Sequence, residues 1–522
     1  MIPIHPPSSG TPPRRSIVAQ IRDNAAAHPD KLALVCGQTR LTWAAFDERI
    51  NRVANLLLAD GMAKGDRIAI LSPNSAEYAV LFMGILRAGG CVTPLSPMAS
   101  PEALQKMLED CAARAIFVAD PYLELVAGFL PQMPITRYAM DVSDPAYLLM
   151  TEALNAAPAT DPMVPIDLHD AFNLIYSSGT TGTPKGILHD HWMRAAQMDR
   201  VTPNGYDDNA RTLISTPLYS NTTIVSFIPT LFGGSTVHLM AKFDARAYLG
   251  IVQAERITHT MLVPVQYKRI MEVPDFDQFD LSSMRVKFST SAPLRADVKA
   301  DVLARFPGKL VEYYGSTEGG GVTVLVADEY PDKLHTVGKL APGNDIRLID
   351  AEGQEVPPGQ VGEICGRGPT MMAGYFGRDD LTRDYLWHNE KGEVYFRSGD
   401  MGHFDADGFL ILSDRKKDMI ISGGMNIYAN DLELVLLADP DVTDAAVIGV
   451  PSDAWGETPY GLIVLRQGAS RSLEEIRAAA NDRLGKSQRL SGLEARDMLP
   501  RSPIGKILKR ELRAPFWADA PS

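Results

Sequence analysis

Residues 173–186 read Asn-Leu-Ile-Tyr-Ser-Ser-Gly-Thr-Thr-Gly-Thr-Pro-Lys-Gly. The first four residues form an apolar run typical of a buried strand, and glycines and small hydroxyl residues follow as far as Lys185. Small residues allow main-chain N–H groups to approach an anion closely, and hydroxyl groups and a lysine add further donors. The segment therefore predicts a phosphate-binding loop placed directly after a strand.

A Walker A loop, G-x-x-x-x-G-K-[ST], is the competing phosphate-binding pattern. The register does not fit it, because Pro184 stands five residues after Gly179 and Gly186 follows Lys185. A loop made only of ordinary turn residues is the remaining alternative. Ten such residues after a strand, ending in a lysine, favour the phosphate-binding interpretation.

Short apolar runs alternate with amphipathic helical patterns on both sides of this loop. Helices are expected at 16–27, 42–58 and 76–87, with Thr42 and Ser75 as N-caps. Alternation of this kind predicts an α/β fold, with parallel-rich sheets covered by helices. The expected strands are 32–36, 67–71, 91–95, 115–118, 171–176, 212–215, 237–239 and 286–289.

The pattern changes near Lys339. Short strands with Gly and Asp turns, at 346–350, 362–366, 394–397 and 402–412, predict a small β-subdomain. A charged run at 414–418 follows, and then a helix at 431–438, strands at 445–450 and 460–465 and a helix at 473–484. We therefore expect an N-terminal body over 1–413, a hinge at 414–417 and a small, mobile α+β lid over 418–522.

Composition excludes several classes of protein. The chain has 522 residues, of which 45% are hydrophobic and 22% charged, and this balance is typical of a globular enzyme of several folding units. The net charge of −13 disfavours nucleic acid and anionic membranes as partners. Four scattered cysteines indicate reduced thiols, and the longest apolar stretch, 79–86, is too short to span a membrane. The expected location is cytoplasmic.

Six further stretches, together with the loop at 177–186, resemble in order the motifs of the ANL superfamily of adenylate-forming enzymes. This superfamily includes acyl-CoA synthetases, the adenylation domains of peptide synthetases, and luciferases. The resemblance extends from about residue 17 to 512 and favours the acyl-CoA synthetase type. The matching stretches are 290–294, 313–318, 397–400, 414–417, 422–427 and 500–506.

The resemblance implies that a substrate carboxylate attacks the α-phosphate of ATP, giving an acyl adenylate and pyrophosphate, and that the acyl group then passes to coenzyme A. The first step crowds negative charge and calls for Mg²⁺ and a cation at the reacting centre. The implied nucleotide-binding residues are Ser177, Ser178, Gly179, Thr180, Thr181, Gly182, Lys185, Ser291, Ala292, Pro293, Tyr313, Tyr314, Gly315, Ser316, Thr317, Asp400 and Arg415.

Individual roles follow from the same resemblance. Glu318 and Thr181 would hold the magnesium ion, Tyr314 would stack on adenine, and Asp400 would accept the ribose hydroxyls. Lys506 would bridge the α-phosphate and the carboxylate during adenylation. Lys417 would be the pivot about which the lid turns between the two half-reactions. The expected catalytic set is Lys506, Lys185, Thr181, Glu318 and Lys417.

The acyl pocket is expected to accept a neutral-bodied carboxylic acid: aromatic, alicyclic or fatty. An α-amino acid would need a buried acid for its ammonium group, and residues 220–225 contain none. Ser220 stands where the family has a His or aromatic gate, so the gating mechanism is left open. The expected pocket residues are Tyr219, Asn221, Thr223, Phe288, Gly319 and Gly320, and those near coenzyme A are Gly423, Gly424 and Met425.

Other functions stay open at this point. The chain could be a non-catalytic AMP or acyl-adenylate binder, although intact Lys506, Glu318 and Asp400 favour catalysis. It could also be an adenylating enzyme with another acceptor, or a luciferase. A zinc site at His189 and His191 would require a third ligand that the sequence does not supply. The oligomeric state is undecided, with a homodimer as one possibility.

Overall fold

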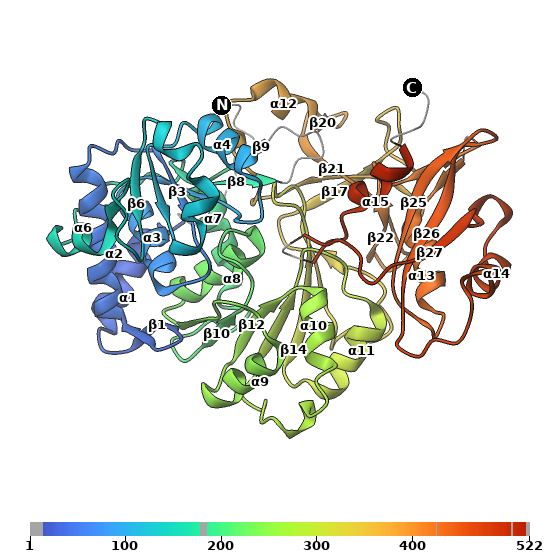
Figure 1. The fold of residues 1–522 in the computed structure, drawn as a ribbon, viewed down its shortest axis with the longest axis horizontal. Coiled ribbons are helices and arrows are strands. Elements are labelled where there is room, and N and C mark those ends of the chain that lie inside the picture. The colour runs from blue at the N-terminus through green and yellow to red at the C-terminus, as the bar shows by residue number, and fades with distance from the viewer. Residues whose placement is uncertain (1–13, 178–184, 424, 503–504, 518–522) are drawn as a thin grey trace. The chain divides into compact units, whose positions relative to one another are not determined.

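The protein is described by a computed structural model that covers residues 14–177, 185–423, 425–502 and 505–517. The chain divides into two units, and each is described by itself (Figure 1). Unit one contains Met1–His335, Leu340–Asp345 and Gly366–Phe396, and unit two contains Thr336–Lys339, Ile346–Cys365 and Arg397–Ser522. Residues 397–417 therefore group with the C-terminal residues, while the hinge at 414–417 stays a prediction. No helix of the described residues is long and apolar enough to cross a membrane.

The first sheet of unit one has nine strands in the described part of the chain, in the order β16-β15-β14-β13-β12-β10-β11-β1-β2. Its inner pairs are parallel, and β2 and β15 pair antiparallel near the two ends. The strands are β1 (Leu32–Cys36), β2 (Thr39–Thr42), β10 (Arg211–Ile214), β11 (Thr236–Leu239), β12 (His259–Leu262), β13 (Val286–Ser289), β14 (Lys309–Tyr314), β15 (Thr323–Val326) and β16 (Lys339–Leu340).

The second sheet of unit one has eight strands within the described residues, in the order β19-β9-β8-β4-β3-β5-β6-β7. Strands β3 to β8 pair in parallel, and β9 is antiparallel to both of its neighbours. The strands are β3 (Arg67–Leu71), β4 (Cys91–Pro94), β5 (Ala115–Val118), β6 (Thr136–Ala139), β7 (Leu148–Leu149), β8 (Ala171–Ser177), β9 (Lys185–Asp190) and β19 (Gly374–Tyr375).

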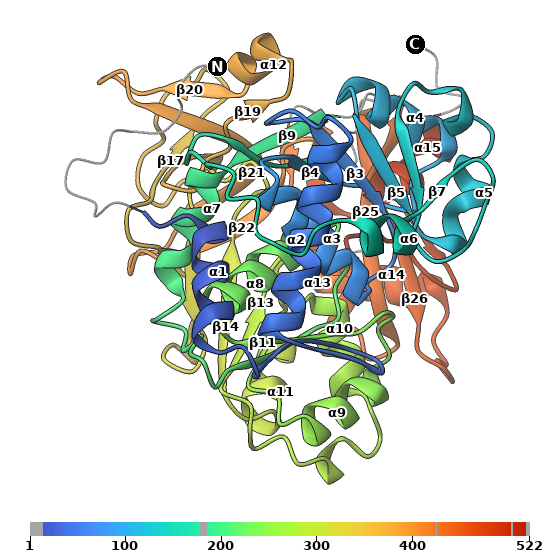
Figure 2. The same ribbon diagram turned by 90° about the vertical axis from the view of Figure 1, so that its left-hand side faces the viewer.

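The main core of unit one joins both sheets through helices α1, α2, α3 and α8 (Figure 2). Phe82 of α3 and Phe227 of α8 meet edge to face with ring centroids 5.8 Å apart. The helices of unit one are α1 (Ile17–Ala27), α2 (Trp43–Ala59), α3 (Ala76–Arg87), α4 (Pro101–Asp110), α5 (Leu123–Val126), α6 (Met150–Ala156), α7 (His191–Gln197), α8 (Asn221–Phe232), α9 (Ala245–Ala254), α10 (Pro264–Met271), α11 (Ala296–Arg305) and α12 (Asp379–Asp384).

The expected N-caps are confirmed. Thr42 accepts a hydrogen bond from the Ala45 N–H at 3.2 Å, and Ser75 accepts one from the Tyr78 N–H at 3.0 Å. Each hydroxyl satisfies a main-chain donor that the first turn of a helix leaves without a partner. The predicted α/β body of parallel-rich sheets covered by helices is likewise confirmed.

A five-stranded sheet, as far as the structure describes it, has the order β17-β18-β21-β20 with β22 beside β21. Its strands are β17 (Asp345–Ile349), β18 (Gly362–Arg367), β20 (Leu386–His388), β21 (Val394–Phe404) and β22 (Leu410–Arg415). The prediction of one strand over 402–412 is wrong. Asp405 interrupts it with a turn, because its carboxylate accepts hydrogen bonds from the N–H groups of Asp407 and Phe409.

The C-terminal part of unit two is the expected small α+β unit. Its sheet has the order β24-β23-β26-β25 with β27 parallel to β26, and helices α13 and α14 contribute to its core. The elements are β23 (Ile420–Ser422), β24 (Met425–Ile427), α13 (Ala429–Leu437), β25 (Val442–Ser452), β26 (Gly456–Leu465), α14 (Leu473–Arg483), β27 (Gly492–Ala495) and α15 (Lys509–Trp517).

Candidate active site

The expected phosphate-binding loop joins two antiparallel strands. The last residue of β8, Ser177, pairs with Lys185, the first residue of β9. A Walker A loop leads from a strand into a helix, and here a strand follows instead, so the topology also argues against that motif. The predictions for Ser178, Gly179, Thr180, Thr181 and Gly182 lie outside the described residues, as does that for Gly424.

Lys185 lies beside two tyrosines from a distant part of the chain. Its Nζ donates a hydrogen bond to the Tyr385 hydroxyl at 3.0 Å and lies 4.9 Å from the centre of that ring. The same Nζ is 5.9 Å from the centre of the Tyr375 ring. These contacts orient the ammonium group at the end of the expected phosphate-binding loop.

Glu318 approaches the same pair of tyrosines. The Tyr375 hydroxyl donates a hydrogen bond to Glu318 Oε1 at 3.0 Å, and burial raises the pKa of that phenol, with the Glu318 charge adding to the effect. The rings of Tyr375 and Tyr385 meet edge to face at 5.6 Å. The fold thus gathers Lys185 and Glu318, both predicted from the sequence, around two tyrosines that the sequence analysis missed.

Ser291 connects the segment after β13 with the start of α8. Its backbone has a φ of +81°, and its hydroxyl is hydrogen-bonded to the hydroxyl of Thr222. Thr222 is the neighbour of two expected pocket residues, Asn221 and Thr223. The structure therefore brings an expected nucleotide-binding residue against the segment expected to bind the acid.

Phe288 and Tyr313 form part of an aromatic column. Their ring centroids are 5.8 Å apart, and Phe288 stacks on Tyr206 at 5.9 Å. The Tyr313 hydroxyl accepts a hydrogen bond from Asn204 at 3.1 Å. Tyr314, the last residue of β14, is only partly buried, and its stacking on adenine stays a prediction.

The expected pocket residues of the 219–223 segment differ in their hydrogen bonds and in their burial. Asn221 Oδ1 accepts a hydrogen bond from Arg194 Nη2 at 2.9 Å. Burial raises the pKa of the Tyr219 hydroxyl. The Thr223 hydroxyl is fully buried and donates to the Pro217 carbonyl at 2.6 Å, so it stabilises the start of α8.

Gly319 and Gly320 are enclosed by main chain. Gly319 has a φ of +86°, and a Cβ there would lie 1.7 Å from the Thr370 carbonyl oxygen. A Cβ on Gly320 would lie 2.8 Å from the Gly366 carbonyl oxygen. The missing side chains therefore allow close backbone packing, and any role of these glycines in lining the acyl pocket stays a prediction.

Asp400 and Arg415 are brought together in unit two. They are cross-strand partners on β21 and β22, and Arg415 Nε lies 3.1 Å from Asp400 Oδ1. Lys417 follows in the turn between β22 and β23, where burial, and then the charge of Arg415, lower its pKa. The expected ribose acceptor and the expected clamp are thus paired in this structure.

Lys506 lies in a short arm that is closed by an antiparallel bridge between Arg501 and Ile507. Its N–H donates to Ser502 Oγ at 3.2 Å, and its carbonyl accepts from the Ser502 N–H at 2.8 Å. This local pairing fixes the backbone from which the Lys506 side chain extends. The role of the lysine in adenylation stays a prediction.

Gly423 packs against a tryptophan that the sequence analysis missed. Its N–H donates to the Trp455 carbonyl at 2.8 Å, and a Cβ at this position would lie 2.8 Å from the indole ring. Trp455 is 60% exposed and Met425 is 55% exposed. Of the expected CoA residues, Gly423 therefore contacts an exposed tryptophan of unit two, and Met425, the first residue of β24, is itself exposed.

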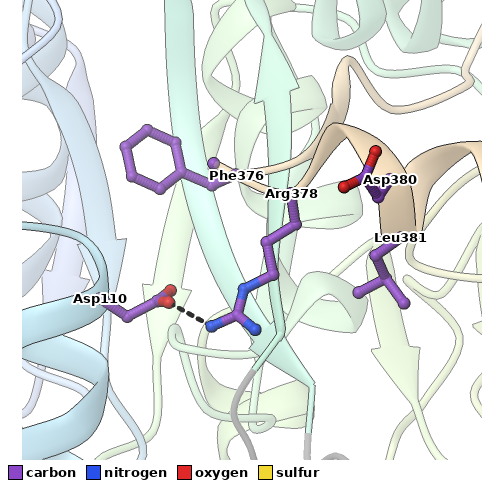
Figure 3. A pocket seen from close by; sticks show the side chains of 6 residues that line it. Asp110, Phe376, Arg378, Asp380 and Leu381 are labelled. Atoms are coloured by element: carbon purple, nitrogen blue, oxygen red, sulfur yellow. Dashed lines mark hydrogen bonds and ion pairs between the residues drawn. The ribbon is translucent and has the colours of Figure 1, made fainter.

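A hollow of about 480 Å³ lies near the hairpin of β8 and β9 in unit one (Figure 3). Its walls include Asp110 and Arg378, whose carboxylate and guanidinium are 2.7 Å apart. The Phe376 N–H donates to the Gly186 carbonyl at 2.8 Å, so the hollow adjoins the strand that starts at Lys185. Among the residues that the structure describes, no predicted site residue lines it. The lining residues are Asp110, Phe376, Gly377, Arg378, Asp380 and Leu381.

His189 is engaged within the protein at both ring nitrogens. Its Nε2 lies 2.7 Å from the Thr317 carbonyl oxygen, and its Nδ1 lies 2.8 Å from Arg194 Nη2. Burial, together with the Arg194 charge, holds the pKa of His189 well below its usual range. His191, also buried, has its pKa lowered to about 4. The ring nitrogens of His189 are therefore used for hydrogen bonding rather than for a metal.

Comparison with known proteins tests the expected family. Residues 21–376 match the family described as AMP-binding enzyme, and residues 431–506 match the AMP-binding enzyme C-terminal domain. The chain belongs to the AMP-binding enzyme family. The predicted relationship to adenylate-forming enzymes of the acyl-CoA synthetase type is therefore confirmed.

Relatives of this AMP-binding enzyme match it over nearly its whole length. A feruloyl-CoA synthase from Amycolatopsis is 34% identical, over 94% of this chain and 97% of the relative. A long-chain-fatty-acid–CoA ligase, FadD13 of Mycobacterium tuberculosis, is 30% identical over 97% and 100%. The crystal structure of ATP-bound MatB from Rhodopseudomonas palustris has a TM-score of 0.87 at 27% identity, covering 97% of this chain and 99% of MatB.

Proposed function

We propose that this AMP-forming acid–CoA ligase activates a carboxylic acid that lacks an α-amino group: an aromatic, alicyclic or fatty acid. The observation that carries the proposal is the assembly of Lys185, Glu318 and their two tyrosines beside the expected phosphate-binding loop. A lysine and a carboxylate so placed suit a reaction that builds negative charge on phosphate oxygens. The names of the relatives, feruloyl-CoA synthase and fatty-acid–CoA ligase, support the same class of acid.

The electrostatics of the expected acyl pocket support a substrate without an ammonium group. Asn221 accepts a hydrogen bond from Arg194, whose side chain is fully buried. A buried guanidinium in contact with a pocket residue repels a second cation in that pocket more strongly than it would in water. An α-amino acid would place its ammonium group in this field, and residues 219–225 offer no carboxylate to offset the repulsion.

In the first half-reaction, an oxygen of the substrate carboxylate attacks the α-phosphorus, and the bond from that phosphorus to the pyrophosphate oxygen breaks. In the second, the CoA sulfur attacks the acyl carbonyl carbon, AMP leaves and the thiol proton is released. Lys185 donates to phosphate oxygens, and Lys506 neutralises charge between the carboxylate and the α-phosphate. Asp400 accepts hydrogen bonds from the ribose hydroxyls. Arg415 is close enough to Asp400 to orient the same part of the nucleotide.

The residues fit a magnesium ion as well. The Glu318 carboxylate is oriented by Tyr375 through Oε1 and keeps lone pairs for a hard cation, which prefers oxygen ligands. We assign Glu318 and Thr181 to hold it, and when bound the ion neutralises charge on the phosphates. We also infer a cytoplasmic location, supported by free cysteines, three of which are buried.

The test compares acids that differ in one group. AMP release is measured with and without CoA for 3-phenylpropionate and for phenylalanine, which differ only in the α-ammonium group, together with a fatty acid and a hydroxycinnamate. We expect CoA-dependent AMP and thioester from acids without an ammonium group, and none from phenylalanine. Equal use of phenylalanine would overturn the proposed substrate class.

The same assay separates the remaining alternatives. Pyrophosphate release without thioester, in the presence of CoA, would indicate another acceptor. ATP binding without pyrophosphate release for any acid would indicate a non-catalytic binder.

A further inference from the structure

A polar network whose centre, Asn173, His189 and Arg194, is fully buried connects the expected acyl pocket with the segment that carries Glu318. Arg194 of α7 is 0% exposed, and its Nη2 donates to Asn221 Oδ1 at 2.9 Å. Its Nε and Nη2 both donate to Asn173 Oδ1, at 3.0 and 2.8 Å. Buried polar groups are costly unless their hydrogen bonds are satisfied, so a cluster of this kind fixes the geometry of its members.

The network sets the protonation state of His189. A main-chain carbonyl only accepts, so the hydrogen bond to the Thr317 carbonyl places the imidazole proton on Nε2. Nδ1 is then the acceptor, and it accepts hydrogen bonds from Arg194 Nη2 at 2.8 Å and from Asn173 Nδ2 at 3.1 Å. Because Arg194 is a permanent donor, the arrangement permits one neutral tautomer with one orientation of the ring.

The hydrogen bond from His189 acts on the peptide unit that leads into Glu318. The Thr317 carbonyl and the Glu318 N–H belong to one planar group, so holding the carbonyl toward β9 also fixes the direction in which Glu318 starts. The Glu318 carbonyl accepts from the Met372 N–H at 2.8 Å, and its carboxylate accepts from Tyr375. His189 therefore holds the peptide group before Glu318, Met372 holds the peptide group after it, and Tyr375 holds the carboxylate itself.

We propose that His189, held by Arg194 and Asn173, is a positioning residue that orients Glu318 for the magnesium complex of ATP. This inference rests on the assignment of Glu318 in the proposed function. It predicts that loss of the Nε2–H donor weakens the gain in ATP affinity that Mg²⁺ provides, while ATP binding without metal is unchanged. Residues that orient a metal ligand typically contribute about ten- to a hundredfold to metal affinity.

The experiment measures ATP binding by calorimetry in the absence of acid, once with excess Mg²⁺ and once with EDTA. We expect His189→Leu to reduce the Mg²⁺-dependent gain in affinity about tenfold. His189→Gln carries an N–H donor of similar reach, and we expect it to restore most of the gain. Equal behaviour of the Leu and Gln variants, or a full gain in His189→Leu, would overturn the positioning role.

His259→Leu is the matched control. His259 is also 0% exposed, and its Nε2 also lies against a main-chain carbonyl, that of Asn204, at 2.8 Å. This variant should lose stability as His189→Leu does and yet keep the Mg²⁺-dependent gain. If both variants lost the gain, the effect would be one of general destabilisation and the proposal would be wrong.

Two more variants complete the design. Glu318→Gln should abolish the Mg²⁺-dependent gain in affinity. If this variant keeps the gain, the assignment of Glu318 to the metal is wrong. If Glu318→Gln loses the gain and His189→Leu keeps it in full, only the positioning role of His189 is wrong. Should His189→Leu not fold, Arg194→Met removes one of the two donors to Nδ1 and leaves the other, Asn173, while keeping a similar volume. It should reduce the gain about threefold, and an unchanged gain would contradict the proposal.

Discussion

The hydroxyl of Tyr375 donates a hydrogen bond to Oε1 of Glu318 across 3.0 Å, although 57 positions separate the two residues in the chain. Tyr375 belongs to β19, which pairs with the strand that begins at Lys185. One short edge strand thus positions an aromatic ring beside the lysine and a hydroxyl on the carboxylate. The two expected catalytic groups are coupled through this tyrosine.

Tyr375→Phe should lower kcat/KM for adenylation about tenfold. The variant keeps the ring and removes a hydrogen bond to a charged acceptor, which contributes about 1.5–3 kcal/mol. The measurement is acid-dependent pyrophosphate release. Tyr395→Phe is the control, because the Tyr395 hydroxyl donates to Asp345 at 2.6 Å, a pair that is not part of the expected site. Equal losses in the two variants would indicate stability rather than catalysis.

Lys506→Ala should reduce adenylation about 100-fold, since the lysine is expected to stabilise charge that develops only in the transition state of that step. Thioester formation from a synthetic acyl adenylate should change far less. Each half-reaction is measured alone, and Lys486→Ala, an exposed lysine in the same unit, serves as the control. Loss of both half-reactions to the same extent would contradict the assignment.

Lys417→Pro tests the predicted hinge. Lys416 is still tied to the sheet by its N–H, which donates to the Gly399 carbonyl at 2.8 Å, and β23 begins only at Ile420. Proline fixes φ near −65° and so denies one of two backbone poses at a pivot. We expect a burst of pyrophosphate followed by very slow thioester formation.

Lys417→Ala should complete both half-reactions, because alanine restricts φ no more than lysine does. If the proline variant also completes both, the pivot is elsewhere. If it fails in both, the substitution has damaged the fold.

Gly319→Ala should lower the stability of the folded protein, whichever acid is the substrate. The added Cβ would overlap the Thr370 carbonyl oxygen, and the positive φ is itself unfavourable for alanine. Gly392→Ala shares the positive φ but meets no atom within 4 Å, and should cost only about 1 kcal/mol. Urea unfolding of both variants checks this. A Gly319→Ala protein as stable as Gly392→Ala would contradict the packing described here.

His259 gives a pH dependence of known sign. Burial lowers its pKa to about 4 in the folded protein, below the value near 6.5 expected for the unfolded chain. Between these values the unfolded chain binds more protons, so stability is lost as the pH falls from about 6.5 toward 4. His259→Gln should lack this loss.

The stability advantage of the wild type over His259→Gln should therefore shrink by about 1 kcal/mol between pH 7.5 and pH 5.5. Urea unfolding at both pH values measures it. An advantage that grows in acid would mean that His259 is charged in the folded protein.

The sequence predicted the local structure well wherever one segment carries its own signal. Thr42 and Ser75 cap helices as expected, because a side-chain oxygen satisfies donors within the same turn. The strand before the glycine-rich loop and the small C-terminal unit were also predicted, since hydrophobic periodicity is a local property. The strand expected over 402–412 failed because Asp405 forms a turn with its own neighbours.

Sequence alone also determined the family, because seven short motifs occur in the right order and each is readable without its neighbours. Only the tertiary structure decided which residues surround Glu318. Tyr375, which contacts Glu318, and His189, which contacts the Thr317 carbonyl and is held by Arg194, lie far from it in sequence, and no periodicity or spacing relates them to it. Their contacts depend on how β9, β14 and β19 converge, and convergence of distant strands is settled by packing of the whole unit rather than by any segment of it.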